Sequence, residues 1–295
     1  MESRAGLGPP CREGIKTMGY KTLLTVLSDE NQMPLVDAAM ALARSEDAHL
    51  AVFCLGIDHT QIGYYYAGAS AYVLQESIDR AMEAASAIEA RVRAKLEGED
   101  IRWSVESAVA QTGGVSSLIG LRARFADLAI LAKPYGAAAA GDAEIVVEAA
   151  LFEGDCPVLI VPESGLHANF RDHILIGWNQ SSEAMVATRR ALPFLRGANE
   201  VEIAVVEPSP NGPEGSEPGG MLAKWLNRHG IRTNIAVLPK TLPRISELLN
   251  RRAIETGASM IVMGAYGHSR FREAILGGAT RNMLEQAQVP VFMAR

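Results

Sequence analysis

The clearest chemical pattern in the chain follows the apolar run Met260–Met263. Two residues separate Gly264 from Gly267, and nine residues separate Gly267 from the paired glycines Gly277 and Gly278. Glycine permits positive φ and lets a ligand approach the backbone closely. Successive amides before a helix can also form a nest for an anion. The spacing therefore predicts a loop that binds a phosphate chain, although it is neither a Walker A sequence nor a dinucleotide fingerprint.

Polar side chains in and after this loop could add to such a site. Thr280 offers a hydroxyl, and His268, Arg270 and Arg272 offer hydrogen-bond donors or charge. Each has a plainer explanation too. A glycine loop between a strand and a helix is often only a tight turn, and basic loop residues are commonly solvated.

Short apolar runs alternate with helical patterns along the chain, and these elements must position the loop. Apolar runs of this kind indicate buried strands, and strands that alternate with helices predict a parallel sheet covered by helices on both faces. Ligands bind such sheets beyond the carboxyl ends of the strands, which places a site just after Trp178, Val206 and Met263. The expected strands are Lys21–Leu27, His49–Leu55, Ile101–Ser107, Asp127–Ala132 and Val158–Val161, then His173–Trp178, Val201–Val206, Arg232–Leu238, Met260–Met263 and Val291–Ala294.

The two halves of the chain repeat each other. Ala126–Leu131 is similar to Ala258–Met263, and Cys156–Val161 is similar to Val289–Ala294, at a constant period of about 130 residues. A constant period across two segments indicates a duplicated domain, in line with the length of the chain. The expected organisation is a flexible leader over residues 1–18, a first domain over 19–162 and a second domain over 171–295.

Composition narrows the classes of function. The formal net charge of −6 disfavours a broad surface for DNA or RNA. No uninterrupted apolar stretch reaches about 18 residues, so no membrane-spanning helix is expected. The leader lacks the apolar core of a secretory signal. Three scattered cysteines without a CxxC pair fit neither a disulfide framework nor a zinc site, and indicate a reducing, cytoplasmic setting.

The spacing of Gly264, Gly267 and Gly277 matches the ATP-binding motif of the universal stress protein family. The chain resembles that family from Tyr20 to Arg295, as a tandem form with two fused domains. The resemblance implies an α/β fold of two tandem, doubly wound, five-stranded parallel-sheet domains of Rossmann-like type. It also implies that their last strands pair antiparallel, so that one chain forms an intrachain pseudo-dimer.

A site for ATP, or for ADP or AMP, in the second domain is what the resemblance implies. Gly264 and Gly267 would lie near the ribose, and the segment from Gly277 to Thr280 would hold the phosphates. Asn179 stands where the family usually has aspartate, and Gly278 stands where it usually has serine or threonine. Trp178 either packs or lines the adenine pocket. The expected binding residues are Trp178, Asn179, Val206, Met263, Gly264, Gly267, His268, Gly277, Gly278, Ala279 and Thr280.

The first half departs further from the family motif. Ala132 replaces the first glycine, Pro134 removes a backbone donor, and Ser28 stands in place of the family aspartate. Asp142 and Glu144 bring carboxylates to the place where phosphates would bind. The first domain is therefore expected to have a degenerate site that does not bind ATP in the family manner.

Three functions stay open. The favoured one is a cytosolic stress-response protein that binds an adenine nucleotide through its second domain. The alternatives are a nucleotide-free interaction module with an unidentified protein partner, and a weak ATPase. No catalytic motif or dedicated metal cage is visible, so no catalytic or metal-binding residue is assigned. Slow hydrolysis, accompanying Mg²⁺ and homodimerisation of two chains are left undecided.

Overall fold

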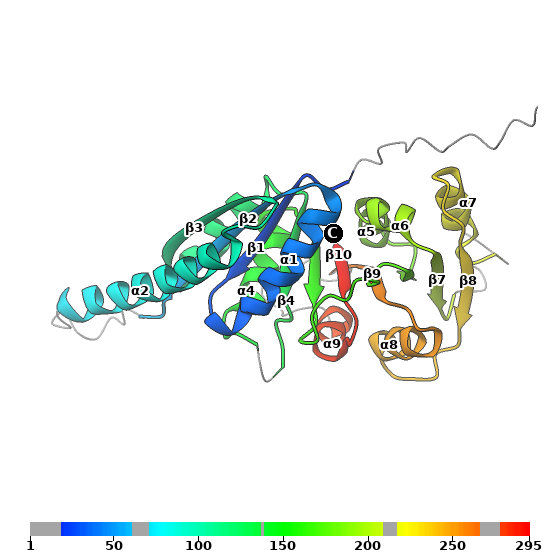
Figure 1. The fold of residues 1–295 in the computed structure, drawn as a ribbon. Helices are drawn as coiled ribbons and strands as arrows, with labels where there is room; N and C mark the ends of the chain where they lie inside the picture. Colours follow the sequence, from blue (N-terminus) through cyan, green and yellow to red (C-terminus); the bar gives the residue numbers. More distant parts are fainter. Residues whose placement is uncertain (1–18, 61–70, 137–138, 209–216, 266–277) are drawn as a thin grey trace, which may run out of the picture.

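The computed structural model describes residues 19–60, 71–136, 139–208, 217–265 and 278–295 (Figure 1). Within these residues, ten strands form a single sheet in the order β3-β2-β1-β4-β5-β10-β9-β6-β7-β8. The first five strands come from the N-terminal half of the chain and the last five from the C-terminal half. Read outward from the centre of the sheet, the two halves have the same strand order, which the predicted duplication requires.

The first half contains β1 to β5 and the helices that connect them. Its strands are β1 (Thr22–Leu27), β2 (His49–Asp58), β3 (Arg102–Gln111), β4 (Leu128–Ala132) and β5 (Val158–Val161). Its helices are η1 (Glu30–Gln32), α1 (Met33–Glu46), α2 (Ala71–Leu96), η2 (Thr112–Gly114), α3 (Val115–Ala123), α4 (Ala143–Glu148) and the π-helical η3 (Ala149–Glu153).

The second half repeats this order with shorter outer elements. Its strands are β6 (His173–Trp178), β7 (Glu200–Val206), β8 (Asn234–Leu238), β9 (Met260–Gly264) and β10 (Val291–Ala294). Its helices are α5 (Ser182–Arg190), α6 (Leu192–Gly197), α7 (Gly220–Arg228), α8 (Ile245–Thr256) and α9 (Gly278–Gln286).

The halves join at the centre of the sheet. β5 and β10 pair antiparallel, with Ile160 opposite Val291 and Val158 opposite Met293, whereas the other strand pairs are parallel. This pairing covers the inner edge strand of each half. It confirms the prediction of two doubly wound halves packed as a pseudo-dimer.

Two apolar layers hold the helices on the sheet. On one face, α1, α2, α5, α6 and α7 cover a layer in which Phe194 packs edge-on against Tyr20 and Phe292, with ring centroids 5.0 and 6.0 Å apart. The Tyr20 hydroxyl donates to the carbonyl of Arg190 at 2.7 Å, which ties the first half to the second. On the other face lie α3, α4, α8 and α9. The aromatic rings supply buried apolar contact area at this junction, and the hydrogen bond of Tyr20 fixes the orientation of its ring.

The outer part of the first half is longer than the apolar runs indicated. The β2–β3 ladder continues to Asp58 opposite Gln111, several residues beyond the predicted ends. The 26-residue helix α2 follows this ladder and projects from the molecule with it (Figure 1). β3 begins at Arg102 and is only partly buried, and the exposed polar residues Glu106 and Ser107 interrupt its apolar pattern before the extension at Ala108. No helix in the described ranges is long and apolar enough to cross a membrane.

Candidate functional site

The turn after β6 is built by two short side chains. The Asn179 side-chain oxygen accepts a hydrogen bond from the Ser181 amide at 3.1 Å, and Ser181 caps α5 by accepting from the Ala184 amide at 3.1 Å. Gln180 between them has a φ of +62°. Asn179 can build this turn as an aspartate would, because only its oxygen is used. Its exposed side chain also keeps an amide group that can donate to a ligand.

Gly264 ends β9 against the start of α5. A Cβ at this position would lie 2.5 Å from the Ala184 nitrogen and 2.6 Å from the carbonyl carbon of Glu183. Both are backbone atoms, so they could not move aside as a flexible side chain would. Glycine is therefore needed here for the approach of a helix to a strand. That approach brings Gly264 beside the turn that carries Asn179.

The predicted residues Trp178, Val206 and Met263 lie on neighbouring strands at the same sheet edge. Trp178 is paired with Val205 on β7, and its predecessor Gly177 is paired with Met263 on β9. Trp178 faces the layer of α5, whereas Val206 and Met263 face the layer of α8 and α9. The indole N–H of Trp178 is buried without a hydrogen-bond partner in the described part of the chain. A buried donor without a partner is uncommon and often marks a site completed by a ligand or water.

α9 begins at this edge as well, since it precedes β10 and β10 runs parallel to β9. Its first residues are Gly278 and Ala279, and Thr280 is buried, with 3% of its surface exposed. The first amides of a helix have no partner inside it, so they favour an anion. Gly267, His268 and Gly277 lie outside the described residues, as do Arg270 and Arg272. Their part in the phosphate loop stays a prediction.

Two polar residues of α8 were not singled out from the sequence. The Ser246 hydroxyl and the Asn250 amide nitrogen are buried and have no hydrogen-bond partner among the described residues. Ser246 as a whole is only 1% exposed. They are four residues apart, so they share one face of α8. Leu249 and Ala253 beside them belong to the apolar layer. A polar pair inside an apolar helical stripe is the signal that could have found them.

The matching turn of the first half is closed by its own side chains. The Gln32 side-chain oxygen accepts from the amides of Ser28 and Asp29 at 2.7 and 3.1 Å. The Asp29 carboxylate accepts from the Asn31 amide at 2.7 Å and completes a capping box. Three backbone donors at the carboxyl edge of β1 are therefore occupied within the protein.

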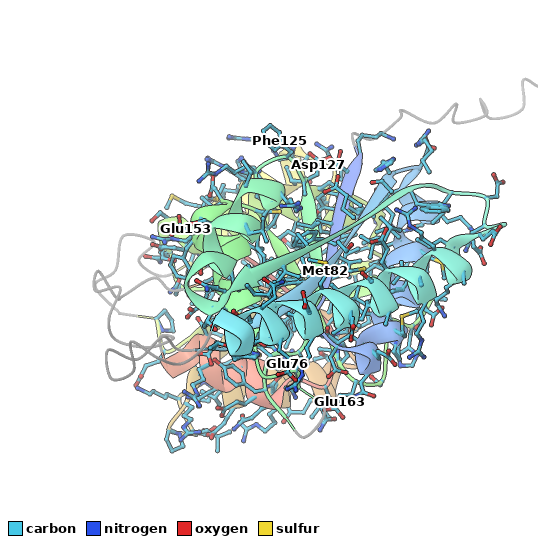
Figure 2. All side chains as sticks on the ribbon, turned by 90° about the vertical axis from the view of Figure 1, so that its left-hand side faces the viewer. Glu76, Met82, Phe125, Asp127, Glu153 and Glu163 are labelled. Carbon is cyan, nitrogen blue, oxygen red and sulfur yellow. The ribbon has the colours of Figure 1, made fainter. Side chains whose placement is uncertain are left out.

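A cavity of about 160 Å³ lies beside this closed turn. It separates the start of α1 from the ends of β4 and β5. The residues that line it are Asn31, Gln32, Pro34, Leu35, Ala132, Lys133, Ala139, Val161, Pro162, Glu163 and Gly165. Figure 2 shows Glu163 at this carboxyl end of the strands and Asp127 at the opposite end. The charged residues that line the cavity are one carboxylate, Glu163, and one ammonium group, Lys133, so the lining has no net positive charge to attract phosphate.

Further carboxylates surround the same edge. His59 lies 3.4 Å from the Asp142 carboxylate. Asp58, at the end of β2, accepts hydrogen bonds from the Ser77 hydroxyl at 2.6 Å and from the Thr60 amide at 2.9 Å. These hydrogen bonds, that of Ser77 first, lower the pKa of Asp58 to about 2. In the described ranges, no group of three or more His, Cys, Asp or Glu side chains could hold a metal ion.

Comparison with known proteins points to one family. Residues 240–295 match the model of the universal stress protein family. A universal stress protein of Synechocystis sp. is 24% identical over 118 residues, which are 38% of this chain and 40% of the relative's length. The match therefore spans less than half of that relative.

Solved structures agree in fold over nearly the whole chain. A universal stress protein from Archaeoglobus fulgidus superposes with a TM-score of 0.69 at 17% identity, covering 93% of this chain and 98% of that one. A protein of unknown function from Pseudomonas aeruginosa PAO1 gives a TM-score of 0.58 at 15% identity, with 93% and 92% covered. At these identities the likeness concerns the arrangement of strands and helices.

Proposed function

The chain belongs to the universal stress protein family, and on that premise we propose that its second domain binds ATP or a related adenine nucleotide in the cytoplasm, as part of a stress response. One observation carries the proposal. The carboxyl edge of β6 and β9 brings Asn179 together with Gly264 and the start of α9, and the last two are the described parts of the glycine motif. The family match, which covers residues 240–295, contains the whole glycine motif.

The chemistry of the donors supports a nucleoside phosphate. The Asn179 amide and the indole N–H of Trp178 are donors suited to sugar or base oxygens and nitrogens. Val206 and Met263 give the edge apolar surface. The first amides of α9 and the Thr280 hydroxyl suit phosphate oxygens. Residues of the first half are not part of this proposed site, because its turn amides are occupied and carboxylates surround its edge.

Calorimetric titration of ATP, ADP and AMP, each with and without Mg²⁺, tests this proposal. We expect one nucleotide per chain, with affinity rising with the number of phosphates. Gly277→Val should abolish binding, because its side chain would block the approach of phosphate to the backbone. Gly141→Val, in the matching segment of the first half, is the control, since a Cβ there meets no atom within 4 Å.

Either of two results would overturn the proposal: no heat at millimolar nucleotide, or unchanged ATP affinity in a folded Gly277→Val protein. An interaction module is then the candidate to pursue. The outer edge strand β8 favours it, since Ile235 and Val237 on one face of that strand are 42% and 52% exposed. Exposed apolar residues on an unpaired edge are typical of contact surfaces.

A further inference from the structure

The loop after β4 in the first half contacts a helix of the second half. This segment, the Lys133–Gly136 loop, stands where the second half carries its glycine motif. The ammonium group of Lys133 donates to the carbonyl of Ala287 at 3.4 Å. The guanidinium carbon of Arg281 lies 5.0 Å from the centroid of the Tyr135 ring. Both partners belong to α9 or directly follow it.

These two contacts fall at opposite ends of α9. Arg281 lies in its first turn, next to Thr280, and Ala287 follows its last residue. Met283 and Leu284 between them are buried in the apolar layer. Apolar packing holds the helix against the sheet but does not fix its position along the helix axis, because the hydrophobic effect is non-directional. The contacts with Lys133 and Tyr135 are directional, so they determine where α9 lies along its axis.

Local chemistry prepares both sides of this contact. Arg281 also donates to the Glu285 carboxylate one turn along α9, at 2.9 Å, which orients the guanidinium group. In the loop, Pro134 restricts φ, and Gly136 has a φ of +123°, a value that side chains rarely allow. A Cβ at Gly136 would also lie 3.1 Å from a Glu163 oxygen. Pro134, which departs from the family motif, and Gly136 therefore both restrict the shape of this loop.

We propose that the Lys133–Gly136 loop positions α9, and thereby sets the affinity of the second domain for the phosphate groups of its nucleotide. Lys133 and Tyr135 are positioning residues in this account, and they act through α9. The inference rests on the proposed function, since the start of α9 is the described part of the phosphate site. A shift of this helix along its axis moves its first amides away from the phosphates and leaves the edge of β6 unchanged.

The test compares ATP with adenosine in the full chain, by calorimetry, for Tyr135→Leu and Tyr135→Phe. The leucine variant removes the ring beneath Arg281, and the phenylalanine variant keeps it. We expect Tyr135→Leu to weaken ATP binding about threefold, the effect of losing one exposed cation–π contact. Adenosine affinity should not change, and Tyr135→Phe should bind both ligands as the unmodified protein does.

Arg281→Gln gives the second arm of the test. Alone it should weaken ATP binding as much as Tyr135→Leu, and the double variant should be no weaker than either single variant, because both remove one contact. If Tyr135→Leu does not fold, Lys133→Met replaces it, with an expected twofold loss for ATP alone, in line with the loss of one long, partly buried hydrogen bond.

The outcomes separate the two proposals. If the unmodified protein binds no ATP, the proposed function fails. If it binds ATP and each variant binds ATP equally well, the positioning role is wrong. An equal loss for ATP and adenosine would also overturn it, since that result indicates a general structural effect on the domain.

Discussion

The two halves of this protein share a sheet topology but differ at the carboxyl edges of their strands. In the first half, the Gln32 side chain reaches back from η1 and takes the amides of Ser28 and Asp29. In the second half, the acceptors are the turn residues Asn179 and Ser181 themselves, and the side-chain amide of Asn179 stays exposed. The difference shows that the turns after matching strands can form different hydrogen bonds while the sheet keeps its strand order.

A second difference concerns a single methyl group. Ala132 ends β4 at the position that Gly264 occupies at the end of β9. Without a Cβ, Gly264 lets the start of α5 touch the strand. Beside Ala132, a cavity of about 160 Å³ separates the strand from α1. Glycine at the end of β9 therefore goes with a helix in contact with the strand, and alanine at the end of β4 goes with a helix that a cavity separates from the strand.

Gly264→Val should produce the largest effect and would sharpen this comparison. The new side chain would overlap backbone atoms of Glu183 and Ala184, which cannot rotate away. We expect the free energy of unfolding in urea to fall by about 3 kcal/mol, the upper end for overpacking. Ala132→Gly is the matched change in the first half, and it should cost about 1 kcal/mol or less. Equal losses of stability in the two variants would mean that α1 lies as close to the end of β4 as α5 lies to the end of β9.

An ion pair in the second half gives the next largest effect. Arg252 of α8 donates twice to the Glu202 carboxylate of β7, at 2.7 Å each, and the Glu202 side chain is 6% exposed. The matching residue of β2 is Ala51, which needs no partner. Arg252→Met leaves a buried carboxylate without a cation. We expect a loss of about 2 kcal/mol in urea unfolding, reduced from a fully buried pair because Arg252 is partly exposed.

The control for this pair replaces both partners. Glu202→Leu combined with Arg252→Met should recover most of the lost stability, since two apolar side chains need no mutual charge. If Arg252→Met alone costs nothing, the pair is solvated in solution, and the second half does not depend on it to hold α8.

Asp58 supplies a pH test confined to the extended β2–β3 ladder of the first half. Its hydrogen bonds lower its pKa to about 2, so the folded protein releases this proton more readily than the unfolded chain does. The resulting stability is present above about pH 4 and is lost as the pH falls towards 2. Urea midpoints measured from pH 7 to pH 2 should therefore fall less steeply in Asp58→Asn than in the unmodified protein. Parallel curves for the two proteins would contradict this.

Much of this fold was predictable because buried parallel strands are continuous apolar runs. Val158–Val161 and Val291–Ala294 were predicted as strands with the bounds that the structure has, and so was their antiparallel pairing. The extension of β2 and β3 was not predicted, since the exposed polar residues Glu106 and Ser107 interrupt the apolar pattern of the outer strand β3 before Ala108. An outer strand lacks the double burial that produces an apolar run.

The candidate site was predictable only where a local rule applies. The turn at Asn179 follows from a short polar side chain before a helix. The neighbour of Gly264 could not be foreseen, because the spacing of glycines does not tell which helix approaches them. Ser246 was missed since polar residues in a helix usually face solvent. The contact of Tyr135 with Arg281 joins residues 146 positions apart in the chain, which no local pattern records.

The smallest effects are expected from the two buried cysteines of the first half. Cys54 matches Val205, and Cys156 matches Val289. Burial raises the pKa of each thiol to about 12, so both should resist iodoacetamide at pH 8 in the folded protein.

A buried thiol behaves as a small apolar group, and the other half accommodates valine at both positions. Cys54→Val and Cys156→Val should therefore each change the free energy of unfolding by less than about 1 kcal/mol. A loss well above that value at Cys54, but not at Cys156, would show that divergence between the halves extends from the site into the packing beneath α2.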